Sequence, residues 1–428
     1  MVRMARGTEG TLWHKRLHQT GARALYLHIP FCRRKCAYCD FASCATRDDN
    51  PLVDEYLAGL RRLLTEAEQA GFFATCRTAY VGGGTPTLLG PRLQSLVAEL
   101  RHAAPGLEEL TCEANPDSLD DEVIDGLAAA GCTRLSIGVQ SLDDGELTAL
   151  GRLHTADQAL DRLRSAVERG VFAVSCDLMC ALPGQTDESW QRTLERAVSC
   201  GVDHVSVYPL QIEDGTPLAQ RIGDADTPWN DTEVQARHME EARRLLEAAG
   251  LARYEVASYA RAGRECHHNC AYWTAEPYLG LGTAASSMLT REGYERLRVL
   301  ASQLPVPEED VSRIRLTCAS DTREVASAAG FRDLHFDLEL MNDAQAAAED
   351  LMLSMRMVRG AGEGLVGHAR TVLGEDLVDE ALAWCAEREL VRREGTRWMP
   401  TESGWLLGNE LYGRLWDLTP SEVASASV

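Results

Sequence analysis

The chain has 428 residues, of which 45% are hydrophobic and 25% charged, as in globular proteins, and its length allows two or three domains. The formal net charge of −22 argues against binding to nucleic acid or to an anionic membrane surface, because both require a basic surface. No apolar run is long enough to predict a membrane span. The 14 cysteines are scattered, unlike a dense disulfide scaffold, which predicts a reducing, cytoplasmic location.

The N-terminal segment is mixed polar and basic. Residues 1–21 lack the apolar stretch of a signal peptide, so we interpret them as a flexible tail. The apolar run that follows, residues 24–29, predicts a buried strand, and Pro30 ends it.

Three cysteines come next, Cys32, Cys36 and Cys39, at the spacing C-x3-C-x2-C. A cubane iron–sulfur cluster usually takes four thiolates, so a loop with three leaves one iron open to a non-protein ligand. Zinc is the alternative, with His28 or Asp40 completing the site. Structural zinc commonly uses pairs of C-x2-C motifs, and the chain has no second such pair. The spacing therefore predicts an iron–sulfur cluster.

Strands and helices then alternate about six times, which is typical of parallel βαβ units. The predicted strands are residues 24–29, 78–81, 110–113, 134–140, 173–179 and 204–210; the predicted helices are residues 51–70, 91–102, 120–130, 155–168 and 189–199. Candidate functional groups recur where strands end, at Cys32, Gly82, Glu113, Gln140 and Asp177. Loops at the carboxyl ends of parallel barrel strands line the site. We predict an α/β fold with an open (β/α)6 partial barrel.

The pattern changes after residue 210. We predict a helix over residues 235–249, a strand over 254–259 and an irregular connector over 296–337. The C-terminal pattern is helical over residues 344–357, 377–389 and 401–415, with a hairpin over 390–399. This arrangement predicts a smaller helical, winged-helix-like domain. The acidic balance favours a cover or docking role for it over DNA binding.

Residues 26–41 read YLHIPFCRRKCAYCDF and resemble the cluster loop of the radical S-adenosylmethionine superfamily. Their opening letters are similar to those of the oxygen-independent coproporphyrinogen III oxidase family and the related HemW haem chaperones. The resemblance covers most of residues 21–290 and, more weakly, the rest. It implies a [4Fe-4S] cluster on Cys32, Cys36 and Cys39, whose open iron takes the amino and carboxylate groups of S-adenosylmethionine.

Further segments match cofactor-contacting positions of that superfamily. Residues 82–87, GGGTPT, follow a strand and lack the patterns of phosphate-binding loops. Taken alone, the loop is also consistent with a tight turn, and Glu113 with a surface carboxylate. The resemblance implies that S-adenosylmethionine is contacted by Tyr26, Tyr38, Gly83, Gly84, Thr85, Glu113, Gln140, Arg152 and Asp177.

A second motif, HHNCAYW, covers residues 267–273. Histidine is a common axial ligand of haem iron, and Tyr and Trp offer flat apolar faces to a porphyrin. On these letters alone, a loop histidine beside a core aromatic pair is the simpler interpretation. The pattern H-N-x-x-Y-W resembles the motif of HemW haem chaperones, which implies haem binding near His268. Cys266, His267 and Cys270 are competing candidate ligands.

One departure separates the two related families. The oxidases carry a fourth cysteine two residues after the third, where this chain has Phe41, and a long N-terminal extension that is missing here. We predict a haem chaperone that holds haem, the cluster and S-adenosylmethionine and passes haem to an acceptor haem protein; no catalytic residue is assigned. An oxygen-independent coproporphyrinogen III oxidase is the alternative, and a zinc or redox regulator a third hypothesis.

These expectations divide the chain into five parts. They are a tail (1–21), a radical S-adenosylmethionine core (22–235), a haem-motif segment (236–295), a variable connector (296–340) and a winged-helix-like domain (341–428).

Overall fold

The computed structural model describes residues 21–47, 49–222, 231–419 and 423–428, so the predicted tail lies almost entirely outside them. Contacts divide the chain into two compact units. The barrel unit comprises Tyr26–Glu55 and Thr78–Cys266, and the second unit comprises Tyr56–Arg77, His267–Val428 and the described residues up to Leu25. The five-part division of the chain stays a prediction. Within the described ranges, no helix is long and apolar enough to cross a membrane.

The barrel unit contains the predicted open barrel. Its strand order is β1-β4-β5-β6-β7-β8-β10-β9, and β4 to β8 pair in parallel. The antiparallel strands β10 and β9 complete the order, so the single strand predicted over residues 254–259 is in fact two. The bounds are β1 (Ala24–Ile29), β4 (Thr78–Gly83), β5 (Glu109–Ala114), β6 (Arg134–Gln140), β7 (Ala173–Cys180), β8 (His204–Pro209), β9 (Ala252–Glu255) and β10 (Ser258–Ala260).

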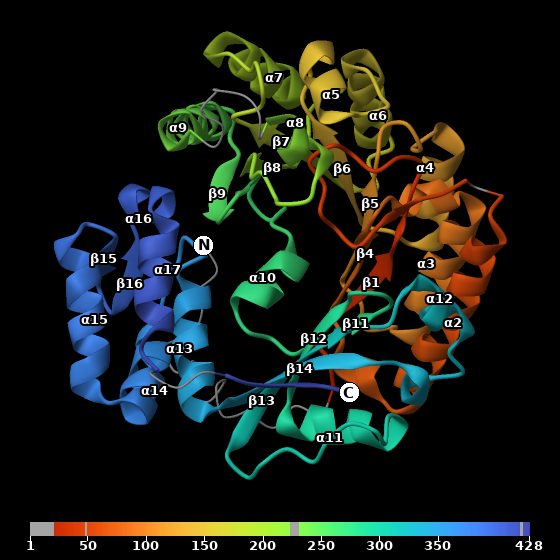
Figure 1. Cartoon of the computed structure of the whole chain (residues 1–428). Helices are drawn as coiled ribbons and strands as arrows, with labels where there is room; N and C mark the ends of the chain where they lie inside the picture. The colour runs from red at the N-terminus through yellow and green to blue at the C-terminus, as the bar shows by residue number, and fades with distance from the viewer. Residues whose placement is uncertain (1–20, 48, 223–230, 420–422) are drawn as a thin grey trace. The chain divides into compact units, whose positions relative to one another are not determined.

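Helices cover the outer side of these strands (Figure 1). Asp120, Asp143, Thr155 and Thr186 start four of them by accepting hydrogen bonds from the first-turn backbone. One of the four, α5, was not predicted. Two short strands, β2 (Phe31–Cys32) and β3 (Cys44–Ala45), flank the cysteine loop. The helix α2 (Pro51–Gln69) begins in this unit and ends in the second. The other helices of the unit are α3 (Pro91–Ala103), α4 (Asp121–Ala130), α5 (Asp144–Leu150), α6 (Ala156–Glu168), α7 (Asp187–Ser199), α8 (Pro217–Ile222) and α9 (Thr232–Ala248).

Alternation along the strands separates a helix-facing side from an interior side. In β6, Leu135, Ile137 and Val139 are fully buried and apolar, whereas the alternate positions include the polar Ser136 and Gln140. The other parallel strands repeat this pattern, so polar side chains converge inside the barrel. The interior is therefore built for a polar or charged ligand.

The second unit contains an antiparallel sheet in the order β17-β14-β13-β12-β11. The strand β13 lies within residues 296–337, where an irregular connector was expected, and β14 begins at the end of that segment, so the expectation is wrong. In β13 the buried Ile314, Leu316 and Cys318 alternate with polar residues, a pattern typical of a half-covered strand. The elements up to this point are α10 (His267–Trp273), β11 (Tyr278–Leu281), β12 (Ser286–Thr290), α11 (Arg291–Leu300), β13 (Val311–Cys318), α12 (Thr322–Ser327), β14 (Phe336–Asn342) and the C-terminal β17 (Ala424–Ser427).

Helices and one hairpin make up the rest of this unit. The helices α13, α14, α15 and α17 pack on one another (Figure 1), and their core includes Leu351, Leu382 and Leu411. The predicted hairpin is confirmed, α14 was missed, and the predicted last helix breaks into two at Leu407. The bounds are α13 (Asp343–Ser354), α14 (Glu363–Leu373), α15 (Glu375–Glu387), β15 (Val391–Glu394), β16 (Arg397–Pro400), α16 (Glu402–Leu406) and α17 (Gly408–Trp416).

Candidate functional site

The cysteine loop is closed at its base by backbone hydrogen bonds. Cys44 N–H donates to Pro30 O (2.8 Å) and Thr46 N–H donates to Cys32 O (2.7 Å). Cys32 is buried at the end of β2, while Cys36 and Cys39 are partly exposed. Burial raises the pKa of the Cys32 and Cys39 thiols. Across the described ranges, no three His, Cys, Asp or Glu side chains are grouped to hold one metal ion.

The glycine loop after β4 lies directly against the cysteine loop. Gly84 N–H donates to Ile29 O (2.8 Å), and Thr85 N–H donates to Phe31 O (2.7 Å). A Cβ on Gly84 would lie 2.7 Å from Phe31 O and 3.0 Å from Cys32 Sγ. The absence of a side chain at Gly84 is therefore what lets the two loops approach each other.

We expect Gly84→Ala to separate these loops. The added methyl group meets a backbone oxygen that cannot move freely, so the free energy of unfolding should fall by about 1–3 kcal/mol, and iron incorporation should fall with it. The measurement is urea unfolding together with iron content after anaerobic reconstitution. Gly413→Ala in α17 is the matched control, because a Cβ there meets nothing within 4 Å and Ala favours a helix. Equal effects of the two substitutions would contradict this interpretation.

A chain of side-chain contacts joins two of the cysteines. Thr85 Oγ1 donates to Cys32 Sγ (3.5 Å) and accepts from Asn115 Nδ2 (2.9 Å). Asn115 Oδ1 accepts from Arg152 Nη2 (2.8 Å), and Arg152 Nη1 donates to Cys36 Sγ (3.4 Å). Residues from the loops after β4 and β5 and from the segment after α5 thus fix the positions of two thiols.

Arg152 fits a negatively charged group at the cysteine loop. Its Nη2 also donates to Gly138 O (2.6 Å), while its Nε is enclosed and has no hydrogen-bond partner among the described residues. Cysteine ligands bind iron as thiolates, which are anionic. A fixed cation beside Cys36, with an unsatisfied N–H, is what such a group requires. The residues present therefore fit a cluster held by thiolates.

Glu113 is held at the end of β5 by two donors. Tyr80 Oη donates to its Oε1 (3.0 Å) and Gly83 N–H donates to its Oε2 (3.1 Å). Burial raises the pKa of Glu113 to about 7, although these hydrogen bonds oppose the shift. Tyr80 stacks on Tyr26 with ring centroids 6.3 Å apart. A carboxylate here can bind a cation, and the neighbouring rings offer an apolar wall.

Asp177 lies on β7, two strands along the sheet from Glu113 on β5, and the hydroxyl groups of two serines hold its carboxylate. Ser136 Oγ donates to its Oδ2 (2.7 Å) and Ser175 Oγ to its Oδ1 (3.2 Å). Ser175 also lies 2.8 Å from His204 Nδ1, and His204 Nε2 lies 2.9 Å from Tyr254 Oη. Burial raises the pKa of Asp177. This row of hydrogen bonds orients the carboxylate within the barrel.

Gln140 adopts a left-handed backbone conformation with φ of 67° at a β-bulge that interrupts the pairing of β6 with β7. Such a conformation costs a non-glycine residue about 1–2 kcal/mol. Its amide lies next to Gly138, because a Cβ built on Gly138 would be 2.9 Å from Gln140 Nε2 and 3.2 Å from Asn115 Oδ1. The bulge thereby brings Gln140 to the group formed by Asn115 and Arg152.

The structure brings together most of the predicted cofactor residues within the barrel unit. Gly83, Gly84, Thr85, Gln140 and Arg152 surround the chain that joins Cys32 and Cys36, and Glu113 adjoins it through Gly83. Tyr38 packs its ring on an apolar cluster with Ala37, Leu150 and Met179, while its hydroxyl interacts with Arg152. The sequence analysis missed three supporting residues, Tyr80, Asn115 and His204. Asn115 directly follows a predicted strand, a signal that could have found it.

His268 belongs to the second unit, on α10. Only 1% of the side chain is exposed, its Nε2 lies 3.0 Å from Tyr272 Oη, and burial lowers its pKa to about 3. Tyr272 in turn meets Tyr278 edge-on, with ring centroids 4.7 Å apart. His267 beside it is exposed. His268 is therefore a neutral imidazole at neutral pH.

Cys266, another candidate ligand, belongs to the barrel unit. It is buried, and its Sγ lies 3.5 Å from Glu109 Oε1. Glu109 also pairs with the buried Arg134 at 3.4 Å.

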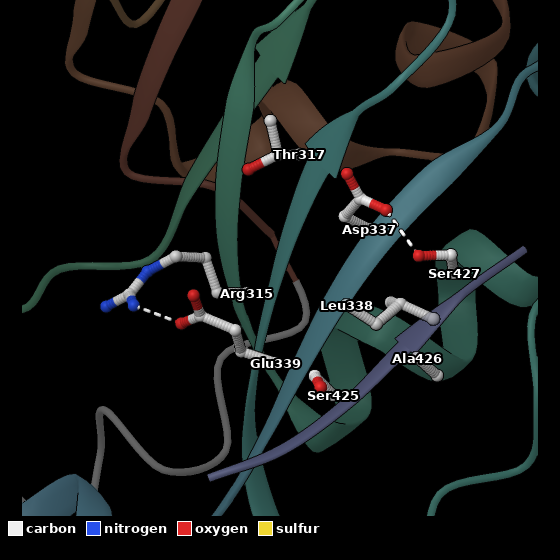
Figure 2. Close-up of a pocket in the computed structure, with 8 residues that line it drawn as sticks. All are labelled: Arg315, Thr317, Asp337, Leu338, Glu339, Ser425, Ala426 and Ser427. Atoms are coloured by element: carbon white, nitrogen blue, oxygen red, sulfur yellow. Dashed lines mark hydrogen bonds and ion pairs between the residues drawn. The ribbon is translucent and has the colours of Figure 1, made fainter. Parts of the chain in front are cut away.

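A surface pocket of about 320 Å³ lies elsewhere in the second unit, on β13, β14 and β17 (Figure 2). Arg315 pairs with Glu339 across it, and Ser427 Oγ donates to Asp337 Oδ1 (2.6 Å). None of the predicted site residues lines it. Its lining residues are Arg315, Thr317, Asp337, Leu338, Glu339, Ser425, Ala426 and Ser427.

The amino-acid sequence of this chain is similar to those of known proteins. Residues 26–197 match the radical SAM superfamily. The Bos taurus protein "Radical S-adenosyl methionine domain-containing protein 1, mitochondrial" is 40% identical over 63% of this chain, but the match spans only 61% of its own length. "Heme chaperone HemW" of Bacillus subtilis is 30% identical over 91% of this chain and 98% of its own.

A solved structure shows the same fold. Coproporphyrinogen III oxidase (HemN) from Escherichia coli, described as a radical SAM enzyme, superposes with a TM-score of 0.74 over 96% of this chain and 94% of its own, at 22% identity. With the near full-length match to the Bacillus subtilis protein, the family is established. The chain belongs to the HemW family of the radical S-adenosylmethionine superfamily.

Proposed function

We propose that this protein is a cytoplasmic haem chaperone, which binds haem together with a [4Fe-4S] cluster and S-adenosylmethionine and passes haem to an acceptor haem protein. The observation that carries this proposal is the match to the Bacillus subtilis heme chaperone, which extends over 91% of this chain. The H-N-x-x-Y-W motif and the three-cysteine loop both lie within the chain, at His268 and at Cys32 to Cys39.

In the barrel unit, Cys32, Cys36 and Cys39 would hold the cluster. When bound, the cluster supplies an open iron for the amino and carboxylate groups of S-adenosylmethionine. Arg152 keeps a positive charge at Cys36, and Glu113 offers a carboxylate toward the cationic cofactor. Tyr26 and Tyr80 form an aromatic wall beside Glu113. The chain's own residues thus bind and orient the cofactor.

In the second unit, His268 is proposed to lie at the haem site. A neutral imidazole is the form that binds iron, and burial keeps His268 neutral. Its Nε2 faces Tyr272 Oη in this structure, so coordination through that nitrogen would require the Tyr272 hydroxyl to move. The exposed His267 is the alternative ligand.

An anaerobic turnover assay tests the proposal against the oxidase alternative, which shares the fold. Reconstituted protein is mixed with reductant, S-adenosylmethionine and coproporphyrinogen III, and protoporphyrinogen is sought by mass spectrometry. We expect no turnover, because Phe41 replaces the fourth cysteine of the oxidase pattern. In a parallel assay we expect haem binding, followed by transfer to an apo haem protein. Multiple turnovers, or the absence of haem binding, would overturn the chaperone proposal.

A further inference from the structure

Arg356 in the second unit is held by aromatic rings rather than by carboxylates. Its guanidinium carbon lies 5.1 Å from the ring centroid of Trp273 and 4.5 Å from that of Tyr412. Trp273 is the last residue of α10, the helix that carries His268, and Tyr412 is on α17. A guanidinium between two rings loses rotational freedom but keeps its hydrogen-bonding edge available.

Among the described residues, one N–H group of Arg356 has no acceptor. Its Nε is enclosed and has no partner, and no carboxylate in the described ranges pairs with its guanidinium. Enclosing an N–H without an acceptor is energetically unfavourable. Buried polar groups that lack partners in a native structure commonly serve a ligand. The side chain as a whole is partially exposed, so a ligand can reach it from solvent.

Other arginines of the unit show how different this environment is. Arg313 pairs with Glu349 and Asp350, each at 2.7 Å, and Arg315 pairs with Glu349. In a chain of net charge −22, carboxylates are abundant. An arginine beside the α10 motif that has none is therefore suited to an anion that comes from outside the chain.

We propose that Arg356 binds a propionate carboxylate of haem. This assignment rests on the proposed function and names the anionic contact that haem would make. The planar guanidinium matches a carboxylate with two parallel hydrogen bonds, and Trp273 and Tyr412 fix its plane before the ligand arrives. Trp273 belongs to the helix that carries His268, so Arg356 is held against the same helix as the proposed haem-binding histidine.

The test compares ferric haem with ferric haem dimethyl ester, which lacks the carboxylates. Both are titrated into the wild-type protein and into Arg356→Met and Arg356→Lys, and the Soret change is followed. We expect Arg356→Met to weaken haem binding about tenfold or more and to leave ester binding unchanged. Arg356→Lys should recover part of the loss, because it keeps the charge but not the paired donors.

Arg414→Met is the matched control. Arg414 also contacts a tryptophan ring, Trp384 at 5.6 Å, and its Nε also lacks a partner among the described residues. Trp384 lies on α15 rather than α10. We expect haem binding by this variant to equal that of the wild type, with a comparable melting temperature for all folded variants.

The outcomes separate this assignment from the proposed function. If the Arg356→Met variant binds haem as tightly as the wild type, or if its binding of haem and of the ester is weakened equally, the propionate contact is overturned. The chaperone proposal then still stands. Wild-type protein that binds neither porphyrin would overturn the chaperone proposal and this assignment together.

Discussion

Cys36→Ala is expected to lose the cluster. The loop offers three thiols, and with two left an iron–sulfur cubane would have two irons without protein ligands. Cys36 also accepts from Arg152 Nη1, so the substitution removes the one thiol that this cation contacts directly. Iron should fall from about four atoms per chain to near zero, and the visible absorption of the cluster should disappear.

Cys44→Ala provides the comparison. Cys44 is exposed on β3, next to the same loop, but lies outside the three-cysteine spacing. Its loss should leave iron and sulfide content unchanged. Unchanged iron in Cys36→Ala, or equal losses in the two variants, would contradict the cluster assignment. Measuring zinc in the same samples tests the alternative metal directly.

The barrel and its cysteine loop were predictable because their signals are local. The strands over residues 24–29 and 134–140 have the predicted bounds. The first is a short apolar run that a proline ends, and the second is an alternating run that ends at a bulge. The motif letters around Cys32 lie within one loop, so no distant contact is needed to recognise them. The family comparison confirms the fold that this region implied.

The contacts that complete the site could not be predicted in the same way. Thr85 and Asn115 follow β4 and β5, whereas Arg152 follows α5, the helix after β6. The parallel pairing of these strands brings the three residues together. The spacing of motif residues along the sequence does not show which loops contact one another in the fold. His204 is similar, because a single polar residue in an apolar strand does not reveal that it supports Ser175 on the neighbouring strand.

Other elements were not predicted because residue composition was given more weight than the alternation of apolar and polar residues. Residues 296–337 contain charged and small residues, which suggested an irregular segment, although the run from Arg313 to Cys318 alternates strictly. The period-2 signal was present but short, and its partners, β12 and β14, are distant in the sequence. The missed α5 has only seven residues, too few for periodicity, but Asp143 and Gly151 mark its two ends.

S-adenosylmethionine binding is expected to weaken as the pH falls through 7. The cofactor carries a positively charged sulfonium, so it favours the ionised form of Glu113. Burial raises the pKa of Glu113 to about 7, and below that pH the carboxyl is mostly protonated. Affinity at pH 6 should therefore be about tenfold lower than at pH 8. Equilibrium binding to reconstituted protein, measured anaerobically at both values, gives the ratio.

Glu113→Gln separates this effect from the titration of the cofactor itself. The variant keeps one carbonyl oxygen, which can accept from Tyr80 or from Gly83 but replaces only one of the two carboxylate oxygens, and it has no charge. Its affinity at pH 8 should be about tenfold lower or more, and its pH dependence should be only that of the cofactor. Glu122→Gln, an exposed carboxylate on α4, should behave as the wild type. Equal slopes for the wild type and Glu113→Gln would contradict the assignment of Glu113.

The same pKa shift predicts an opposite effect on stability. Because folding raises the pKa of Glu113, its favourable contribution is complete below the unfolded value of 4.5 and is lost as the pH rises through about 7. Glu113→Gln has no such titration. Without cofactor, its melting temperature relative to the wild type should therefore be higher at pH 8 than at pH 5. A difference that does not change with pH would show that Glu113 is not buried as a carboxyl group. The expected pattern would instead show that Glu113 lowers stability at neutral pH while it strengthens cofactor binding.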